Sequence, residues 1–537
     1  MRNLFIFIFL FYFILGNSQG ENNNWYFGQA ATLNFAFNPP ISVSPSNSSM
    51  NQYEGVASIS DSNGNLLFYS DGITIWNRIG TEMPNGNGLT GDISSCQSVI
   101  IIPYPEQPKK YFIITNPRAG LSIFNYVSYS IIDMDLNNGF GDIPIGFKNI
   151  ALKDENGLSI SLNSEGLTSV INDKGNGYWV LIKRDKLYSF PITKNGFSNI
   201  PIISLIPNNI MNDNGVEHIK ISPDNTKISI TKSNSPSSVK IYNFNNFNGQ
   251  IDNSYSLEVI GNALYTSEFS PDNKILYITS GLPGEGLKIV NLETFQYRSI
   301  LNSTPYYGTI QRTKHNDIYI TKFENYLDKI NNPNDYFNSN ILLNNIFLNN
   351  YSSLGLPQLI QPLWCQDNLN LNYTEFNNNF NYQVSNSIIT NGNYKIDIGK
   401  NINLYAGNSI NLSPNTYLTS GSNVLAKIQN CPISSNFNKN SKSNNPKSIK
   451  HIINFDENLK LIIFPNPSKD YIEISLKKEK IKIIKITSII DSALIFEIHI
   501  EPNSSYQYDI SQLKTGIYIV NVITDDGKSF SEKLIKN

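Results

Sequence analysis

The sequence predicts an all-β protein assembled mainly from a repeated antiparallel sheet. The chain has 537 residues and contains 30 Tyr and 29 Phe, and residues of this kind favour strands. Amphipathic helical periodicity is almost absent. A hairpin pattern recurs along the first two thirds of the chain: an alternating strand, a polar turn and a second strand. Together these observations indicate a β-propeller followed by smaller β domains.

Four segments carry the hairpin pattern clearly, and 98–115 and 309–321 are weaker copies. The clear copies are "VASISDSNGNLLFYS" (56–70), "TSVINDKGNGYWVLI" (168–182), "HIKISPDNTKISIT" (218–231) and "TSEFSPDNKILYIT" (266–279). In Ser-Pro-Asp-Asn, proline fixes φ at the turn and asparagine tolerates the left-handed conformation. The turns recur on average about every 51 residues, which is near the period of a four-stranded blade.

Residues 20–365 are therefore predicted to form a seven-bladed propeller, within a range of six to eight blades. Seven blades give about 49 residues each. To close the ring, the first strand, within "NNWYFGQAATLNFAF", is expected to share a blade with the last strands before Trp364. Such closure removes exposed sheet edges.

The propeller segment resembles a family of secreted β-propeller proteins of Bacteroidota, distantly similar to WD-repeat and TolB-like propellers. The resemblance rests on "NNWYFGQAATLNF", "EGVASISDSNGNLLFYSDGITIWNR", "MPNGNGL" and "FSPDNKILYIT". These motifs are structural. They imply a fold and a lineage, and they imply no activity.

Residues 366–431 are predicted to form a small β-stack, because short strands alternate with Gly or Pro-Asn corners about every ten residues. The stretch "AGNSINLSPNTYLTSGSNVLAKI" resembles the stack found before sorting domains in the same lineage. The expected inward positions are Ile388, Ile396, Ile398, Ile402, Leu404, Ile410, Leu412 and Leu418. Cys365 and Cys431 bracket the segment and are the favoured disulfide pair. The alternative is that both, with Cys96, are buried thiols.

The first residues predict a secretory signal peptide at 1–18. Arg2 is followed by 12 apolar residues, Leu4 to Leu15, which are too few to span a bilayer. Cleavage is expected within 18–20, and the small and polar residues of the cleavage region are Gly16, Ser18, Gln19 and Gly20. No later run is apolar enough to span, so the mature chain is expected to have no transmembrane segment.

Residues 432–455 are polar and contain no acid, which predicts a flexible linker. Residues 456–537 alternate again, and their short strands predict an immunoglobulin-like sandwich. This last segment resembles a type IX secretion system C-terminal sorting domain, of type A. The matching residues are Pro465, Asn466, Pro467, Gly516, Tyr518, Lys533 and Lys536. The resemblance implies recognition by the type IX secretion machinery, export across the outer membrane, and a place on the cell surface or outside the cell.

No catalytic or metal motif stands out. Of the four histidines, His218 and His315 lie on or beside repeat hairpins, where a structural role is expected. The stretches "DSNGN" (61–65) and "DLNNGFGD" (135–142) look like pieces of calcium loops but lack the terminal Glu of an EF-hand. We therefore expect no cofactor, with calcium as the alternative. The net charge of −2 gives no basic field for nucleic acid.

Three functions remain open. The sequence favours a binding or adhesion module for an unknown extracellular protein or glycan, with its ligand held by loops at one propeller face. The first alternative is an extracellular enzyme, a hydrolase or lyase of polysaccharide or peptide. An acid pair or His cluster at the central channel would favour it. The second alternative is a structural surface-layer component, which would have no preserved pocket.

Overall fold

The computed structural model describes residues 20–43, 47–120, 126–160, 164–206, 215–234, 236–252, 254–282, 285–300, 306–375, 379–431, 451–454, 461–476, 479–488, 494–525 and 528–537. These ranges contain strands and two single-turn 3-10 helices, η1 (Gly20–Asn22) and η2 (Asn137–Gly139), and no α-helix. The all-β prediction is confirmed. No helix in these ranges has the length and apolarity that a membrane crossing needs. The predicted signal peptide, including Gly16, Ser18 and Gln19, lies outside them.

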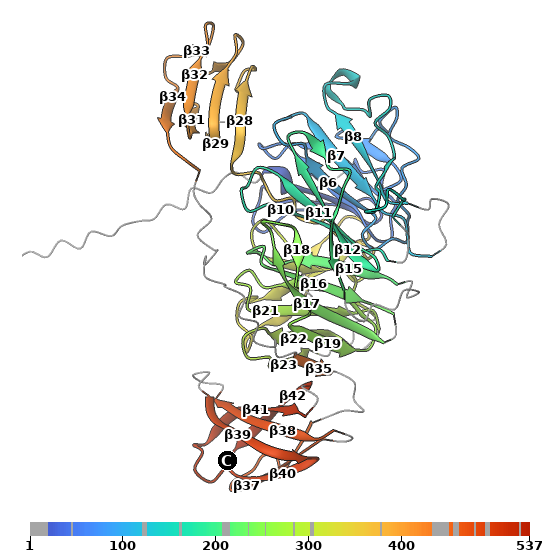
Figure 1. Ribbon diagram of the computed structural model, residues 1–537, viewed down its shortest axis with the longest axis vertical. Helices are drawn as coiled ribbons and strands as arrows, with labels where there is room; N and C mark the ends of the chain where they lie inside the picture. The colour runs from blue at the N-terminus through green and yellow to red at the C-terminus, as the bar shows by residue number, and fades with distance from the viewer. Residues whose placement is uncertain are drawn as a thin grey trace, which may run out of the picture.

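Seven antiparallel sheets follow one another between 24 and 347 in the described residues (Figure 1). Within each sheet, most strands pair with their neighbours in sequence; the exceptions are β14, which pairs with β12, and β19, which pairs with β17. The sheets comprise β1 (Asn24–Phe27) and β2 (Ala31–Asn34); β3 (Ala57–Ser60), β4 (Leu66–Ser70) and β5 (Ile75–Asn77); β6 (Val99–Pro103), β7 (Lys110–Thr115), β8 (Ser128–Asp133) and β9 (Ile150–Ala151); β10 (Leu167–Ile171), β11 (Tyr178–Lys183), β12 (Lys186–Thr193), β13 (Gly196–Phe197) and β14 (Ile202–Leu205); β15 (Glu217–Ile221), β16 (Lys227–Lys232), β17 (Ser237–Asn245), β18 (Gln250–Ile251) and β19 (Leu257–Gly261); β20 (Leu264–Phe269), β21 (Ile275–Ser280), β22 (Leu287–Asn291) and β23 (Tyr297–Ile300); and β24 (Ile310–Arg312), β25 (Ile318–Ile320), β26 (Tyr326–Asn331) and β27 (Asn340–Phe347).

The first strands of successive sheets lie against one another. Contacts run from β1 to β3 and onward through β6, β10, β15, β20 and β24. Sheets whose inner strands meet in this way around an axis form a propeller, which confirms the predicted fold class. The first sheet has only two strands, so the exact number of blades stays a prediction.

Ring closure differs from the sequence expectation. The first strand, β1, pairs with β2, and the last long strand, β27, pairs with β26, so no strand is shared between the two ends. The ends meet through a common core instead, in which Trp25 and Phe27 pack with Tyr319 and Leu327. Polar contacts add to it, since the Asn22 amide and the Ile360 backbone exchange two hydrogen bonds of 2.8 Å.

The hairpin turns adopt the conformation that their residues predict. Asn225, Asn273 and Asn316 have φ values of 60°, 64° and 65°, in the left-handed region that asparagine tolerates. Asp224 accepts hydrogen bonds from Ser222 at 2.6 Å and from the Thr226 N–H at 3.1 Å, which closes the turn. The repeated Ser-Pro-Asp-Asn motif is therefore structural.

The stack is a parallel coil. Its strands are β28 (Gln366–Leu371), β29 (Asn379–Thr390), β30 (Lys395–Ile396), β31 (Asn401–Ala406), β32 (Ser409–Leu412), β33 (Tyr417–Leu418) and β34 (Asn423–Ile428). Asn379 pairs with Asn401, and Asn401 pairs with Asn423, so these coils advance by 22 residues, whereas the first, from Leu369 to Ile388, advances by 19. Of the expected inward positions, Ile388, Ile396, Ile402 and Leu404 are fully buried. The others are not. Ile398 is 72% exposed because it follows the end of β30, at the corner before β31. Leu412 and Leu418 are 44% and 45% exposed because they lie in the last coil, which no further coil covers.

The C-terminal segment contains two sheets that share one core. The first holds β36 (Leu461–Phe464), β37 (Tyr471–Leu476) and β40 (Ser505–Asp509). The second holds β38 (Ile481–Ser488), β39 (Leu494–Asn503), β41 (Gly516–Thr524) and β42 (Lys528–Lys536). Apolar residues from both sheets, among them Ile474, Ile484 and Val520, form the core. Its identity as an immunoglobulin-like sandwich stays a prediction.

One strand joins the propeller to this sandwich. The last part of the segment expected to be a linker forms β35 (His451–Asn454), which pairs in parallel with β19 and with β42. Ile453 is fully buried in the core of the neighbouring blades, and the His451 ring stacks on Phe295 at 3.6 Å between centroids. The rest of the predicted linker, 432–450 and 455, lies outside the described residues.

Candidate functional site

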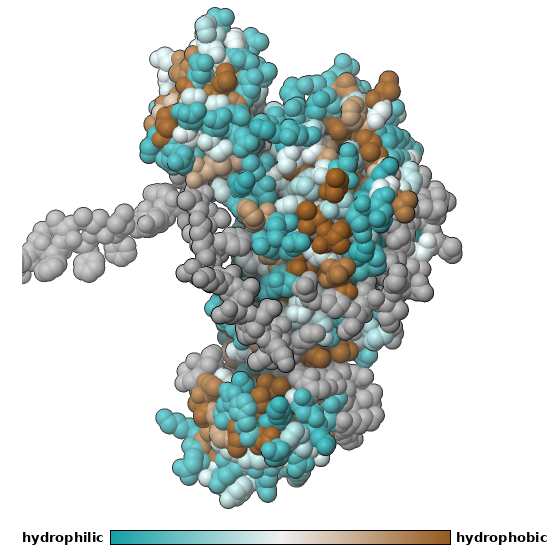
Figure 2. All heavy atoms as spheres, viewed as in Figure 1, coloured by the Kyte–Doolittle hydropathy of each residue, from teal (hydrophilic) through white to brown (hydrophobic). Residues whose placement is uncertain are grey.

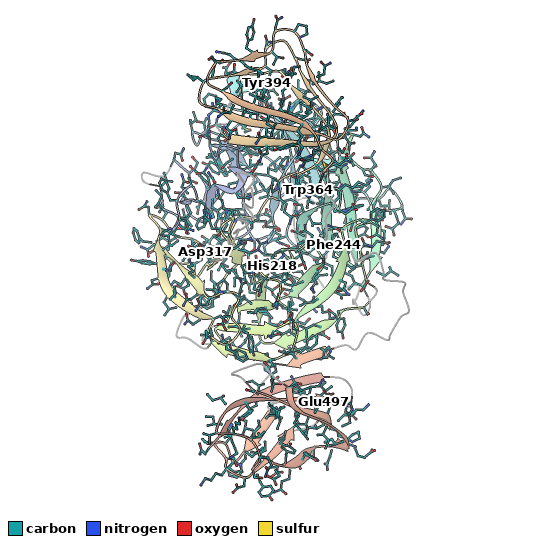
Figure 3. All side chains as sticks on the ribbon, turned by 90° about the vertical axis from the view of Figure 1, so that its left-hand side faces the viewer. His218, Phe244, Asp317, Trp364, Tyr394 and Glu497 are labelled. Carbon is teal, nitrogen blue, oxygen red and sulfur yellow. A yellow bond between two sulfur atoms is a disulfide. The ribbon has the colours of Figure 1, made fainter. Side chains whose placement is uncertain are left out.

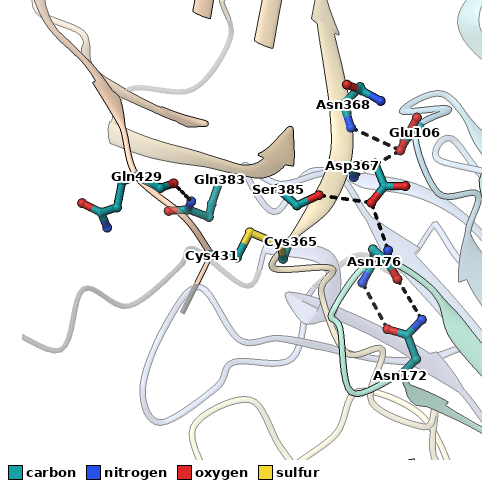
Figure 4. The surroundings of a disulfide bond; sticks show 10 residues. All are labelled: Glu106, Asn172, Asn176, Cys365, Asp367, Asn368, Gln383, Ser385, Gln429 and Cys431. Carbon is teal, nitrogen blue, oxygen red and sulfur yellow. Dashed lines mark hydrogen bonds between the residues drawn. A yellow bond between two sulfur atoms is a disulfide. The ribbon is translucent and has the colours of Figure 1, made fainter. Parts of the chain in front are cut away.

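The stack is anchored to the propeller beside a disulfide. Cys365 and Cys431 are joined, with their Cα atoms 5.9 Å apart and a sequence separation of 66. The backbone N–H groups of Trp364 and Cys365 both donate to the Gly175 carbonyl, at 3.1 and 3.0 Å. Because Cys365 precedes the first stack strand and Cys431 follows the last one, the bond holds both ends of the stack at one point of the propeller (Figure 4).

A polar network around Asp367 fixes the first stack strand. The Asp367 carboxylate accepts hydrogen bonds from Asn176 at 3.2 Å and Ser385 at 3.1 Å, and it pairs with Lys194 at 3.2 Å. The Glu106 carboxylate accepts from the backbone N–H groups of Asp367 and Asn368 at 3.2 and 3.3 Å. These contacts join a propeller hairpin to the stack and orient the two bodies (Figure 4).

A cleft of about 540 Å³ lies between the two bodies, and we call it the aromatic cleft. The surface is hollowed there, between the stack at upper left and the propeller rim (Figure 2). Figure 3 shows Trp364 at this junction, between the stack that carries Tyr394 and the propeller that holds His218. The lining residues are Glu21, Ser60, Asp61, Ser62, Pro103, Tyr104, Glu106, Gln107, Pro108, Lys110, Tyr111, Tyr178, Pro362, Leu363, Trp364, Gln366, Leu369, Tyr373, Phe380, Asn381, Tyr382, Gln383, Val384, Tyr405 and Gln429.

Aromatic rings line both walls of the cleft. Tyr104 stands on the propeller wall, with its ring 4.5 Å from Phe112. Trp364 lies at the floor against Gly175, where a Cβ would come within 2.2 Å of the indole and φ is +70°. Glycine at 175 therefore lets the indole lie flat on the loop. On the stack wall, Phe380 and Tyr405 are partly buried, so their rings are held in place and still reach the cleft.

One carboxyl group of the cleft is incompletely satisfied. The Glu21 Oε2 atom is buried and has no hydrogen-bond partner among the described residues. Burial raises the pKa of Glu21 above its ordinary value, and the nearby Asp61 adds to that effect. The Asp61 carboxylate itself accepts two hydrogen bonds from Asn65, at 2.9 and 3.0 Å.

The propeller contains buried ion pairs. Lys183 pairs with Glu217 at 2.9 Å, and Lys322 pairs with Asp328 at 2.8 Å. His218 is 2% exposed, and neither ring nitrogen has a partner in the described part of the chain. Burial lowers the pKa of His218 to about 3, so the ring is neutral. His315 lies elsewhere and contacts the Phe35 carbonyl at 2.8 Å. The two histidines therefore have different surroundings and do not form one site.

A second carboxyl group with a raised pKa belongs to Glu54. Glu54 precedes the inner strand β3, and the Tyr265 hydroxyl donates to it at 2.8 Å. Burial raises the pKa of Glu54 to about 7, and Glu165 and Asp92 contribute. The Glu165 carboxylate accepts hydrogen bonds from the backbone N–H groups of Cys96 and Ala119, both at 2.9 Å, so its role is structural.

The calcium-like stretches are built as turns. Asp61 closes its own hairpin, as described above, and Asp142 accepts two hydrogen bonds from Asn85, at 2.9 and 2.7 Å. Within the ranges that the structure describes, no three His, Cys, Asp or Glu side chains are grouped to hold a metal ion.

The residues predicted for the sorting signal converge at one end of the C-terminal sandwich. The Asn466 side chain, between Pro465 and Pro467, accepts the Ile535 N–H at 2.9 Å. In the hairpin of β41 and β42, Gly516 faces Lys536, Tyr518 faces Leu534 and Ile519 faces Lys533. The Tyr518 hydroxyl donates to the Lys514 carbonyl at 2.7 Å. The beginning and the end of the domain therefore meet.

The lining of the aromatic cleft was not predicted from the sequence. Tyr104 and Tyr405 lie about 300 residues apart, and no local pattern distinguishes a tyrosine that faces a cleft from one in a strand. The disulfide bracket was the one signal that pointed to this junction. Gly20, from the predicted cleavage region, is buried beside Ser62, close to the propeller wall of the cleft.

Comparisons with solved structures find only distant likeness. The periplasmic gluconolactonase of Pseudomonas aeruginosa has a TM-score of 0.29 and 10% identity, and the match covers 48% of this chain and 74% of that one. Sqt1 of Chaetomium thermophilum has a TM-score of 0.31 and 11% identity, and the match covers 56% of this chain and 74% of that one. The dihydro-heme d1 dehydrogenase NirN has a TM-score of 0.35 and 10% identity, and the match covers 62% of this chain and 75% of that one. No curated protein matches the chain.

The family comparison is specific for the C-terminal segment. Residues 462–537 match the family described as the secretion system C-terminal sorting domain. The match begins at the first strand of the sandwich and includes every residue predicted for the sorting signal. The segment is therefore a sorting domain of the type IX secretion system, and the protein is one that this machinery recognises and delivers to the cell surface or the extracellular space.

Proposed function

We propose that the protein is an exported binding protein and that the aromatic cleft is its ligand site. The observation that carries the proposal is the cleft itself: about 540 Å³, with rings on two walls that come from different domains. Ligand sites commonly have volumes of about 300–1,000 Å³, lie between domains and combine apolar walls with a few polar groups. A purely structural surface component has no need of such a cleft.

The rigidity of the junction supports this proposal. The disulfide and the Asp367 network hold the stack against the propeller, so the walls are set before a ligand arrives. Preorganisation of this kind lowers the entropy lost on binding. The sorting domain places the site where extracellular polymers are available.

The test is a binding screen of the mature chain against soluble extracellular polysaccharides and peptides. The variant carries Tyr104→Ala and Tyr405→Ala, one change on each wall. The control is Tyr417→Ala, since Tyr417 is 59% exposed and lies on the stack away from the cleft. The proposal expects a ligand that the wild type and the control bind and the double variant does not. A ligand set bound equally by all three proteins would overturn it.

The second candidate function is an extracellular enzyme with Glu54 as its acid. A carboxyl group with a pKa near 7 is still partly protonated at neutral pH, as a general acid requires. Tyr265 orients the carboxyl group. If this reading holds, Glu54→Gln abolishes turnover of a polymer substrate and leaves binding in the cleft unchanged. Turnover that survives the substitution would exclude Glu54 as the acid.

A further inference from the structure

We propose that the aromatic cleft binds a neutral oligosaccharide. This inference rests on the proposed function and names its ligand class. Three features of the cleft carry it: flat apolar rings on opposite walls, hydrogen-bonding groups between them, and a charge balance that suits an uncharged ligand.

Aromatic rings line the cleft from both the propeller and the stack. Tyr104 faces from the propeller, Trp364 from the floor, and Phe380 and Tyr405 from the stack. A sugar ring has one face of C–H groups, which packs on an aromatic face while the hydroxyl groups point sideways. Because Gly175 and Phe112 hold two of these rings in place, the stacking costs little side-chain entropy.

Amide groups supply the complementary hydrogen bonds. Gln107 belongs to the propeller wall, and Asn381, Gln383 and Gln429 belong to the stack wall. The Gln383 amide donates to the Gln429 carbonyl at 3.0 Å, which leaves its side-chain oxygen available as an acceptor. An amide both donates and accepts hydrogen bonds, as a sugar hydroxyl does. This is the pairing that polyhydroxylated ligands need.

The charges of the cleft disfavour acidic ligands. Its charged lining residues are Glu21, Asp61, Glu106 and Lys110. Lys110 is paired with Asp133 at 3.4 Å, so no lysine or arginine of the lining is left over for a carboxylate or phosphate.

A basic ligand is disfavoured for a different reason. Glu106 and Asp61 already accept hydrogen bonds from the fold. Burial raises the pKa of the remaining acid, Glu21, which weakens its attraction for a cation. Glu21 therefore gives the cleft little attraction for a basic ligand.

The experiment is calorimetric titration of the mature chain with defined probes: neutral β-1,4-glucan, α-1,4-glucan and β-1,4-mannan hexasaccharides, an acidic oligogalacturonate and an oligolysine peptide. We expect a neutral hexasaccharide to bind, Tyr104→Ala and Tyr405→Ala each to weaken it at least about tenfold, and Tyr417→Ala to leave it unchanged. Two different wall variants are used so that a folding defect in one does not decide the outcome.

The remaining outcomes separate this inference from the proposed function. If oligolysine or oligogalacturonate binds and only that binding is lost in the wall variants, the saccharide class is wrong and the binding function stands. If neutral hexasaccharides bind equally to wild type and wall variants, the site assignment is wrong. If no probe binds to the wild type, the saccharide inference is overturned, while the proposed function is still judged by the wider polymer screen.

Discussion

Loss of the Cys365–Cys431 disulfide is expected to unfold the stack and leave the propeller folded. The perturbation is the double variant Cys365→Ser and Cys431→Ser. The bond closes a loop with a sequence separation of 66 residues, and the loop-closure entropy of that length corresponds to about 4 kcal/mol at 25 °C. The core of the stack is small: among the described residues it has nine buried members, such as Ile388 and Leu404. Cores of such small units supply only about 3–5 kcal/mol.

The two quantities are similar, so the reduced stack should be marginal. The assay is hydrogen exchange by mass spectrometry. Amides of β29 and β31 should exchange much faster in the double variant, while amides of β16 and β21 keep their protection. A reducing agent should reproduce the effect in the wild type and add nothing to the double variant. Non-reducing peptide mapping should recover a Cys365–Cys431 crosslink.

Two results would refute this reasoning. One is alkylation of Cys365 in the native protein, which would show that the bond is not formed. The other is an unchanged exchange rate in β29 and β31, which would show that contacts with the propeller carry the stability of the stack. Because the stack forms one wall of the aromatic cleft, the double variant should also lose ligand affinity.

Three further outcomes are expected. Deletion of 456–537 should leave the propeller in the periplasm, and surface display of the truncated chain in a fractionation assay would contradict the sorting role. The folded protein keeps a proton on Glu54 that the unfolded chain loses above pH 4.5, so this group's contribution of about 3 kcal/mol is lost as pH rises through about 7. Urea unfolding should show a smaller free energy of unfolding at pH 8 than at pH 5, and Glu54→Gln should reduce this difference. A difference of the same size in the wild type and the variant would refute the prediction. Ile453→Ala should lower the free energy of unfolding at the blade edge by about 2–5 kcal/mol and speed amide hydrogen exchange in β19. Ile495→Ala, at a position that is 46% exposed, is its control, and an equal effect of both would count against the docking.

The local features of the fold could be predicted from sequence. Turn chemistry predicts the hairpins at Asn225 and Asn273, because proline and asparagine restrict the backbone directly. The 22-residue coil of the stack follows the same logic of strands and corners. The exposure of Ile398 was missed, since alternation identifies a face and does not show that the strand ends at Ile396.

Non-local features could not be predicted. Strand β35 lies in a polar stretch, and its pairing with β19 is decided by an open sheet edge about 190 residues earlier in the chain. The aromatic cleft depends on how two domains are joined, and the residues that join them, such as Asp367 and Glu106, look like ordinary surface polar residues in the sequence. Such contacts depend on three-dimensional proximity, which periodicity does not encode.

The pairing of β35 has a consequence for the protein once its sorting domain is removed. The propeller sheet that ends in β19 continues through β35 into β42, so the propeller and the sorting domain share one hydrogen-bonded sheet. If the segment from 451 onward is removed, the backbone groups of Leu257 to Ile260 lose their partner strand. The released molecule then presents an open sheet edge that was shielded during transport, and unpaired edges of this kind accept an extended segment from another chain. Removal of the sorting domain would thus also expose an adhesive sheet edge, which becomes available only after export is complete.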